Sequence, residues 1–242
     1  MQVILLHGNS SSSRSWQWLL ESESLRGHEL VPLDLPGHGG GPYDSSPNYS
    51  LRGLATTLTR FVHTSAPVPR VVVGWSLGGH VALEAAATVP QLRGLMLIGA
   101  PPTGFPASGF LSMPTASMSR YPLPEHVREH IEGLCRDSSK RMVFEQDFAV
   151  TDPRVREDLA RCIASGDFAD EVDIIRGSLP VAAVMGEHDH LIDLRYLQEL
   201  PWGNLWEHQV HLVAGAMHAP QCDAPEAVAK LISRFVSHLH HG

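Results

Sequence analysis

The sequence predicts an α/β fold in which a mainly parallel, doubly wound sheet carries an inserted helical segment. Short, almost entirely apolar runs recur along the chain, as expected for strands that are buried on both faces of a parallel sheet. These runs alternate with stretches of helical periodicity, which is typical of repeated strand-helix units. The alternation stops after residue 100 and resumes at residue 179. We therefore assign residues 1–100 and 179–242 to one α/β core and residues 101–178 to a helical cap.

The composition is that of a globular protein with a substantial core. The 242 residues are 43% hydrophobic and 18% charged, without the run of about 18 apolar residues that a bilayer span needs. The net charge of −8 and the scattered basic residues disfavour a nucleic-acid partner. The first residues, MQVILLHG, lack the basic start and long apolar stretch of a signal peptide. We expect a cytoplasmic protein that binds neither nucleic acid nor membrane.

Four strands are predicted before residue 100. Each is a short apolar run that is followed by glycine, proline or a polar loop: Gln2–Leu6, Glu29–Asp34, Arg70–Gly74 and Gly94–Ile98. The loop after the second strand, LPGHGGGP, is too rich in glycine and proline to contain a regular element.

Three helices separate these strands. A short helix is predicted over Trp16–Leu25. In Leu51–Ser65, apolar residues recur every three or four positions, which indicates a helix with one face in the core. Leu77–Val89 is an amphipathic stretch of small residues that directly follows the third strand.

The cap is predicted to be helical, and the α/β pattern returns after it. The cap helices are Pro124–Arg136, Lys140–Phe148 and Pro153–Ser165; they are followed by strands Val181–Met185 and Gln209–Val213 and by helices Leu194–Leu200 and Pro225–Leu239. Aromatic and Met side chains of the cap, such as Phe110, Met113 and Met118, form either its own core or an acyl pocket.

The segment GWSLG places Ser76 at a sharp turn between a strand and a helix. A serine at the tip of such a turn has a strained backbone, and Gly74 and Gly78 avoid side chains that would collide with the strand and the helix. The amides that begin the following helix face Ser76. The Gly-x-Ser-x-Gly pattern alone also fits an ordinary turn, but its strand-helix context favours a nucleophile.

Two residues further along the chain complete a candidate catalytic triad. In this architecture the order is Ser, then Asp or Glu, then His. Asp189 follows the strand VAAVMG, and His218 lies in the loop after the strand QVHLV. All three residues therefore follow the carboxyl end of a strand, where parallel sheets bind ligands. We expect His218 to take the proton of Ser76, and Asp189 to orient the imidazole and stabilise its charged form.

Each triad candidate also has a plain structural explanation. Ser76 fits a turn serine, Asp189 a helix cap and His218 a loop histidine. Their joint occurrence in the right order on three separate loops favours the triad. Asp193 competes with Asp189 for the role of the acid, although it is expected to lie inside the next helix.

Backbone amides are predicted to form an oxyanion hole beside Ser76. Leu77 follows the nucleophile, and the loop after the first strand brings Asn9 opposite to it. Gly8 in that loop, Trp75 before the nucleophile and His80 one helical turn after it are candidate substrate-binding residues. Trp75 contributes to the wall of either the pocket or the core, and His80 either lines the pocket or packs inside the protein.

No metal or other cofactor is predicted. The three cysteines, Cys135, Cys162 and Cys222, are far apart in the sequence and fit reduced thiols better than a disulfide framework. The chain contains fifteen histidines but no HxHxDH or HExxH motif.

Six segments together resemble the α/β-hydrolase superfamily: LLHGNSSS, LDLPGHG, GWSLGGH, LRGLMLIGAPP, GEHD and MHAP. Within it, HGNSSS, GWSLGGH, GLMLIGAPP and GNLWE with the HAP histidine look most like the AidH-type N-acyl-homoserine lactonases. Those enzymes open the lactone of quorum-sensing signals without a metal. GWSLGGH and the HAP histidine also occur in the esterases that cleave pimeloyl-carrier-protein methyl esters.

The resemblance implies an α/β-hydrolase fold with Ser76 as nucleophile, His218 as base and the amides of Asn9 and Leu77 as oxyanion hole. It places the acid at Asp189, where the lactonases carry Glu. A cap tyrosine near the lactone is replaced around His130, which becomes a further candidate for substrate binding. The chain opens on the third strand of the family sheet, so strands one and two are expected to be missing. Two explanations are open: a partner chain covers the shortened sheet edge in an oligomer, or the first residue of the chain is misassigned.

The sequence therefore predicts a metal-independent serine hydrolase of carboxylic esters. Its leading substrate is an N-acyl-homoserine lactone, with quorum quenching as the role. A general or carrier-protein-linked carboxylesterase is the alternative within the same chemistry, and amide cleavage by the same triad is another. A non-catalytic receptor for a small ester or lactone is the alternative from a different class, because a fold alone does not establish catalysis.

Overall fold

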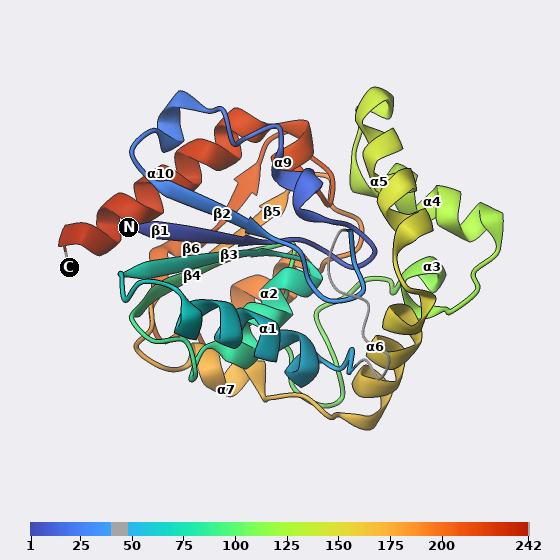
Figure 1. Cartoon of the computed structure of the whole chain (residues 1–242), viewed down its shortest axis with the longest axis horizontal. Coiled ribbons are helices and arrows are strands. Elements are labelled where there is room, and N and C mark those ends of the chain that lie inside the picture. Colours follow the sequence, from blue (N-terminus) through green and yellow to red (C-terminus); the bar gives the residue numbers. More distant parts are fainter. Residues whose placement is uncertain (40–47, 242) are drawn as a thin grey trace.

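A six-stranded sheet forms the centre of the computed structural model, which describes residues 1–39 and 48–241 (Figure 1). The strand order is β2-β1-β3-β4-β5-β6, and all neighbouring strands are parallel. The strands are β1 (Gln2–Leu6), β2 (Glu29–Leu33), β3 (Arg70–Trp75), β4 (Leu92–Ile98), β5 (Val181–Gly186) and β6 (Leu205–Val213). The predicted α/β fold with a parallel sheet is confirmed.

Helices cover both faces of this sheet. They are α1 (Leu51–Thr64), α2 (Leu77–Ala85), α3 (Thr115–Met118), α4 (Pro124–Leu134), α5 (Ser138–Val150), α6 (Pro153–Ser165), α7 (Glu171–Ile175), α8 (Leu194–Glu199), α9 (Pro220–Asp223) and α10 (Pro225–His241). In Figure 1, α10 lies on one side of the sheet and α1, α2 and α7 lie on the other. The sheet is therefore doubly wound, as predicted.

Strand side chains alternate between two apolar cores, because successive residues of a strand point to opposite faces. Val71 and Val73 of β3 belong to the core that contains Phe235 of α10. Val72 belongs to the core that contains Leu54 of α1. Burial on both faces is the physical reason for the nearly uniform apolar runs in the sequence.

The helices α3 to α6 lie together beyond the carboxyl ends of the strands (Figure 1). Predicted helices over Pro124–Arg136, Lys140–Phe148 and Pro153–Ser165 correspond to α4, α5 and α6 within a few residues. The division of the chain into a core and a cap at residues 101 and 178 stays a prediction.

The predicted helix over Trp16–Leu25 is wrong. The structure has two short 3₁₀ turns instead, η1 (Ser13–Trp16) and η2 (Glu23–Leu25). Serine side chains bond to nearby backbone amides and so compete with a continuous helix: Ser12 accepts from the amide of Arg14, and Ser22 accepts from that of Ser24. Trp16 and Leu25 still pack in the core.

Several boundaries differ from the prediction. β6 begins at Leu205, four residues early, and α2 ends at Ala85, where the Thr88 hydroxyl caps the carbonyl at 2.9 Å. The short helices α3, α7 and α9 were not predicted, because four or five residues are too few to show a helical period. Residues 40–42 of the LPGHGGGP loop lie outside the described residues.

β2 forms one edge of the sheet beside β1, so the first strand of the chain is an interior strand. Pairing of this edge with a second chain stays a prediction. Among the described helices, none is both long enough and apolar enough to cross a membrane.

Candidate active site

Ser76 lies at the tip of a tight turn between β3 and α2. Its backbone has φ 51° and ψ −119°, a conformation that is rare for a residue with a side chain. A Cβ atom at Gly74 would lie 2.3 Å from the carbonyl oxygen of Gly78, and one at Gly78 would lie 2.3 Å from that of Leu6. Both glycines are therefore required for the close contact of β1, β3 and α2 that presents Ser76.

Asp189 and His218 are joined by a buried hydrogen bond. His218 Nδ1 donates to Asp189 Oδ2 at 2.8 Å, and the other carboxylate oxygen accepts from the amide of Leu191 at 2.9 Å. Burial works to raise the pKa of Asp189, but the facing His218 ring and these hydrogen bonds outweigh it and lower the pKa. Asp189 is therefore the charged acceptor that orients the His218 ring. Because this hydrogen bond uses Nδ1, the other ring nitrogen, Nε2, takes no part in it.

Ser76 and His218 line the same pocket, and Asp189 lies behind His218. Among the described residues, no hydrogen bond joins the Ser76 hydroxyl to His218. Hydrogen bonds between catalytic groups are often long in unliganded proteins and shorten when a ligand binds.

The two predicted oxyanion donors, Asn9 and Leu77, line the pocket with Ser76. Leu77 is the first residue of α2, so its amide has no acceptor within the helix. The side chain of Asn9 is held by its own donation to the carbonyl oxygen of Ser117 at 2.7 Å. That these two amides form the oxyanion hole stays a prediction.

Buried His7 shapes the loop that carries Asn9. His7 Nε2 accepts from the amide of Leu35 at 3.0 Å, and Nδ1 donates to the carbonyl oxygen of Gly8 at 2.8 Å. Burial lowers the pKa of His7 to about 4, so the ring is neutral and can both accept and donate.

Trp75 supports His218 from behind. The indole Nε1 donates to the carbonyl oxygen of His218 at 2.8 Å, and the two rings lie 5.9 Å apart. Trp75 lines the pocket and is also buried in the core, so both sequence interpretations hold. Gly8 is not among the lining residues; its role is to give room to Trp75, whose ring would lie 3.0 Å from a Cβ at this position.

Gly99 touches the candidate triad and was missed by the sequence analysis. It follows β4 with φ +56°, and a Cβ there would lie 3.0 Å from His218 Cε1 and 3.4 Å from Asp189 Oδ2. The only sequence signal was a glycine at a strand end, in IGAPP. A larger residue here would press on the His218 ring and would also strain the backbone at this positive φ.

We expect Gly99→Ala to lower kcat by roughly 10- to 100-fold, because the new methyl group displaces the His218 ring from Ser76. Gly27→Ala is the matched control, since Gly27 also has a positive φ, of +92°, but has nothing within 4 Å. Both variants carry backbone strain, which thermal unfolding will show. Equal kcat losses in the two would contradict a specific contact with His218.

His80 forms a buried pair with Glu171, which the sequence analysis also missed. His80 Nδ1 lies 2.9 Å from both carboxylate oxygens, and Glu171 accepts from the amide of Thr103 at 2.9 Å. Burial works to lower the pKa of His80, but the charge and hydrogen bond of Glu171 together raise it. His80 lines the pocket, so the packed and the pocket-lining interpretations both apply. No motif could have revealed Glu171, which lies in an ordinary acidic stretch.

The pair should make stability depend on pH. The folded-state pKa of His80 is raised. The contribution of the His80–Glu171 pair to the unfolding free energy is therefore fully present below about pH 6.5, and it is lost as the pH rises through the folded-state pKa. We expect the difference in unfolding free energy between wild type and Glu171→Gln to shrink from pH 5.5 to pH 9 in urea titrations. The control is Glu199→Gln, which removes an exposed bond to Arg195 and should give a difference that does not change over this range.

The pocket in front of Ser76 is mainly apolar. It has about 860 Å³ of empty space including its open mouth. Most of its lining beyond the elbow comes from residues 101–178, including Phe110, Met113, Met118, Leu134, Leu159 and Phe168. These side chains therefore belong to the pocket wall.

His130 of α4 also lines the pocket. Its Nδ1 is buried without a hydrogen-bond partner among the described residues, and burial, with neighbouring His218 and Arg156, lowers its pKa to about 4. His130 is thus a neutral polar group opposite the candidate triad. Asp193 does not line the pocket. It caps α8 by accepting from the amides of Arg195 and Tyr196, so it lies just before this helix and not inside it as predicted.

Comparisons with known proteins agree with this fold. The sequence model of the Alpha/beta hydrolase family matches residues 3–231. A solved structure of a variant of N-acyl homoserine lactonase AidH, complexed with N-hexanoyl homoserine lactone, has a TM-score of 0.91 and 30% sequence identity. The match covers 98% of this chain and 90% of that one.

Curated relatives include esterases. An esterase of Mycobacterium tuberculosis is 27% identical over 96% of this chain and 81% of its own length. A pimeloyl-[acyl-carrier protein] methyl ester esterase of Xylella fastidiosa is 44% identical over 103 residues, which are 41% of this chain and 36% of that protein. The chain also spans 47% of a bifunctional biotin biosynthesis protein of Cellvibrio japonicus, at 24% identity.

Proposed function

This chain belongs to the alpha/beta hydrolase family, and we propose that it is a metal-independent serine hydrolase that opens the lactone ring of N-acyl-homoserine lactones. The observation that carries the chemistry is the buried Asp189–His218 hydrogen bond beside the strained turn at Ser76. The similarity to a lactonase over 98% of the chain supports the lactone as the ester.

In the first half of the reaction, Ser76 Oγ attacks the lactone carbonyl carbon while His218 Nε2 takes its proton. The amides of Asn9 and Leu77 donate to the oxyanion, and loss of one such donor typically costs about 10²–10³ in rate. The ring C–O bond then breaks, and the leaving oxygen takes the proton from His218. The leaving alcohol stays attached, because it is part of the same acyl group.

In the second half, His218 takes a proton from water, which attacks the acyl-enzyme carbonyl. The bond to Ser76 Oγ breaks, and Ser76 regains a proton from His218. The product is the open N-acyl-homoserine. Throughout the cycle Asp189 holds the imidazole and stabilises its charged form. A base activates the nucleophile here, so we expect full activity in the presence of EDTA.

We propose that residues 101–178 act as the cap that holds the acyl chain. The apolar side chains of Phe110, Met118 and Leu159 line the pocket next to Ser76 and would bury an acyl chain. His80 of α2 and His130 of α4 are polar side chains of the pocket lining and would contact the amide or lactone oxygens.

A carboxylesterase is the second candidate, favoured by the 44% identity to a pimeloyl-carrier-protein methyl ester esterase over 103 residues. The two candidates are separated by comparing kcat/KM for hexanoyl- and decanoyl-homoserine lactone with that for methyl and p-nitrophenyl esters of the same acyl chains. We expect the lactones to be the better substrates. Turnover of the esters without lactone opening would contradict the lactonase proposal and support the carboxylesterase.

A further inference from the structure

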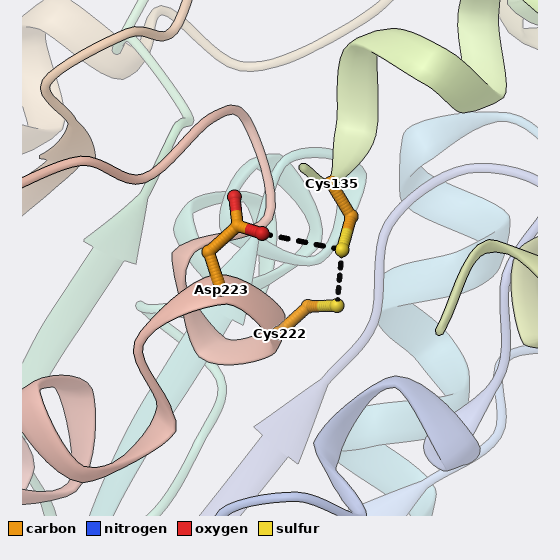
Figure 2. A group of neighbouring side chains, drawn as sticks. All are labelled: Cys135, Cys222 and Asp223. Carbon is orange, nitrogen blue, oxygen red and sulfur yellow. Dashed lines mark hydrogen bonds between the residues drawn. The ribbon is translucent and has the colours of Figure 1, made fainter. Parts of the chain in front are cut away.

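Two buried cysteines face each other where the 101–178 segment meets the loop of His218. Cys135 follows α4, and Cys222 lies in α9, four residues after His218. Figure 2 shows the two side chains pointing at one another, with Asp223 beside them. The sulfur atoms are 2.7 Å apart, and both residues are fully buried as free cysteines. Such a contact between residues 87 positions apart brings two reducing groups together.

Hydrogen bonds hold both sides of this contact in place. Asp223 Oδ1 accepts from Cys135 Sγ at 3.2 Å and from the amide of Arg136 at 2.8 Å, while Oδ2 accepts from the amide of Met217 at 2.8 Å. Lys140 Nζ donates to the carbonyl oxygen of Cys222 at 2.6 Å. The contact is therefore part of a fixed junction that also holds the residue preceding His218.

The three side chains could hold a metal ion as far as their mutual distances are concerned, since their ligand atoms lie within 4.8 Å of one another. The arrangement favours a different chemistry. Two sulfurs on one zinc ion, each about 2.3 Å from it in tetrahedral geometry, must lie more than about 3.5 Å apart. Both oxygens of Asp223 already accept backbone amides. Binding a metal through both sulfurs would have to separate them, whereas forming a disulfide only shortens a contact that already exists.

We propose that Cys135 and Cys222 are a redox-active dithiol, which a peroxide or a small-molecule disulfide converts into a disulfide between the end of α4 and the loop that carries His218. With hydrogen peroxide, one sulfur attacks an oxygen and the O–O bond breaks, giving a sulfenic acid and water. The second sulfur then attacks the first and releases a second water. Two thiols and one peroxide thus give one disulfide and two waters. A small disulfide instead leaves as two thiols after exchange.

The environment sets the rate of this reaction. The hydrogen bond to Cys135, followed by burial, raises the pKa of the Cys222 thiol, so little of the reactive thiolate forms at neutral pH. We expect oxidation to be slow in the folded protein and faster at alkaline pH. Cys162 is the third free cysteine and lies elsewhere, in α6 against the carbonyl oxygen of Asp167.

The cross-link would fix one wall of the pocket. The helix that Cys135 follows, α4, also carries His130, and both His130 and Leu134 line the pocket. A disulfide that spans 87 residues should raise the unfolding temperature by roughly 5–15 °C. The further expectation that turnover of long acyl substrates falls rests on the proposed function, because it assumes that α4 moves when substrate enters.

The test uses the full chain, reduced and then treated with hydrogen peroxide or oxidised glutathione at pH 8. We expect the count of thiols in denaturant to fall from three to one, and peptide mapping without reductant to join Cys135 to Cys222. In Cys162→Ser the thiol count should fall from two to zero. Cys135→Ser and Cys222→Ser should form no internal cross-link, and their unfolding temperatures should not change on oxidation. These readouts need no substrate, so they stand apart from the lactonase proposal.

Three results would overturn the proposal. One is that all three thiols stay titratable after treatment. Another is that the thiols oxidise only to sulfinic acid or to links between chains. The third is that the reduced protein retains one equivalent of added zinc after dialysis and that both single Cys→Ser variants lose it, which would assign the cluster to a metal.

Discussion

Replacing Ser76 by alanine is expected to lower kcat for lactone or ester hydrolysis by about 10⁴- to 10⁶-fold. Ser76 stands at the strained turn and lines the same pocket as His218, and no other nucleophile lies at the tip of β3 in the described structure. Steady-state kinetics will measure the loss. A fluorophosphonate probe should label the wild type and fail to label Ser76→Ala.

The control for this variant is Ser237→Ala, an exposed serine of α10 on the far side of the sheet. It should keep both activity and labelling. The fold of Ser76→Ala should also remain intact, because removing the hydroxyl relieves no packing and adds no atom. Labelling of Ser76→Ala at the wild-type rate would show that another residue is the nucleophile. Absence of labelling in the wild type would instead support a non-catalytic receptor.

Replacing Asp189 by asparagine is expected to lower kcat by about 10³- to 10⁴-fold. An asparagine keeps the size of the side chain but removes the charge, so it no longer stabilises the imidazolium. It can also present its amide group to Nδ1, which favours the wrong tautomer of His218. Unlike Ser76→Ala, this variant keeps its nucleophile, so slow labelling by the fluorophosphonate probe should remain.

Asp193→Asn is the matched control for Asp189→Asn. Asp193 lies four residues away and caps α8, and its carboxylate makes no contact with His218. We expect a small loss of stability and little change in kcat. If Asp193→Asn lost more activity than Asp189→Asn, the acid of the triad would have been misassigned.

The parallel fold followed from the sequence because one physical cause dominates it. Val71, Val72 and Val73 are all apolar because successive side chains enter cores on opposite faces, so strand burial is visible in the pattern itself. The helix predicted over Trp16–Leu25 is wrong for the opposite reason. Its apolar residues do enter the core, but serine side chains accept hydrogen bonds from nearby backbone amides and so break the helix into short turns. The spacing of apolar residues carries no information on these hydrogen bonds.

The residues of the candidate site could be predicted from the sequence where they lie in the loop that follows a strand. Asp189 and His218 were found through their place after strands and their order in the chain, and they do share a hydrogen bond. Glu171 could not be found, because it lies 91 positions after His80 and their pairing depends on how the chain returns to α2. The Cys135–Cys222 contact was missed for the same reason: the distance along the sequence said nothing of the distance in space.

The most direct test of the proposed function is the mass of the product that the wild-type protein forms from N-hexanoyl-homoserine lactone in the presence of EDTA. Ser76→Ala serves as the blank for spontaneous hydrolysis. Attack by Ser76 on the ring carbonyl predicts a single product, N-hexanoyl-homoserine, heavier than the substrate by one water. Release of hexanoate and free homoserine lactone would show that the amide is cleaved instead, and conversion no faster than in the blank would contradict lactone hydrolysis by this site.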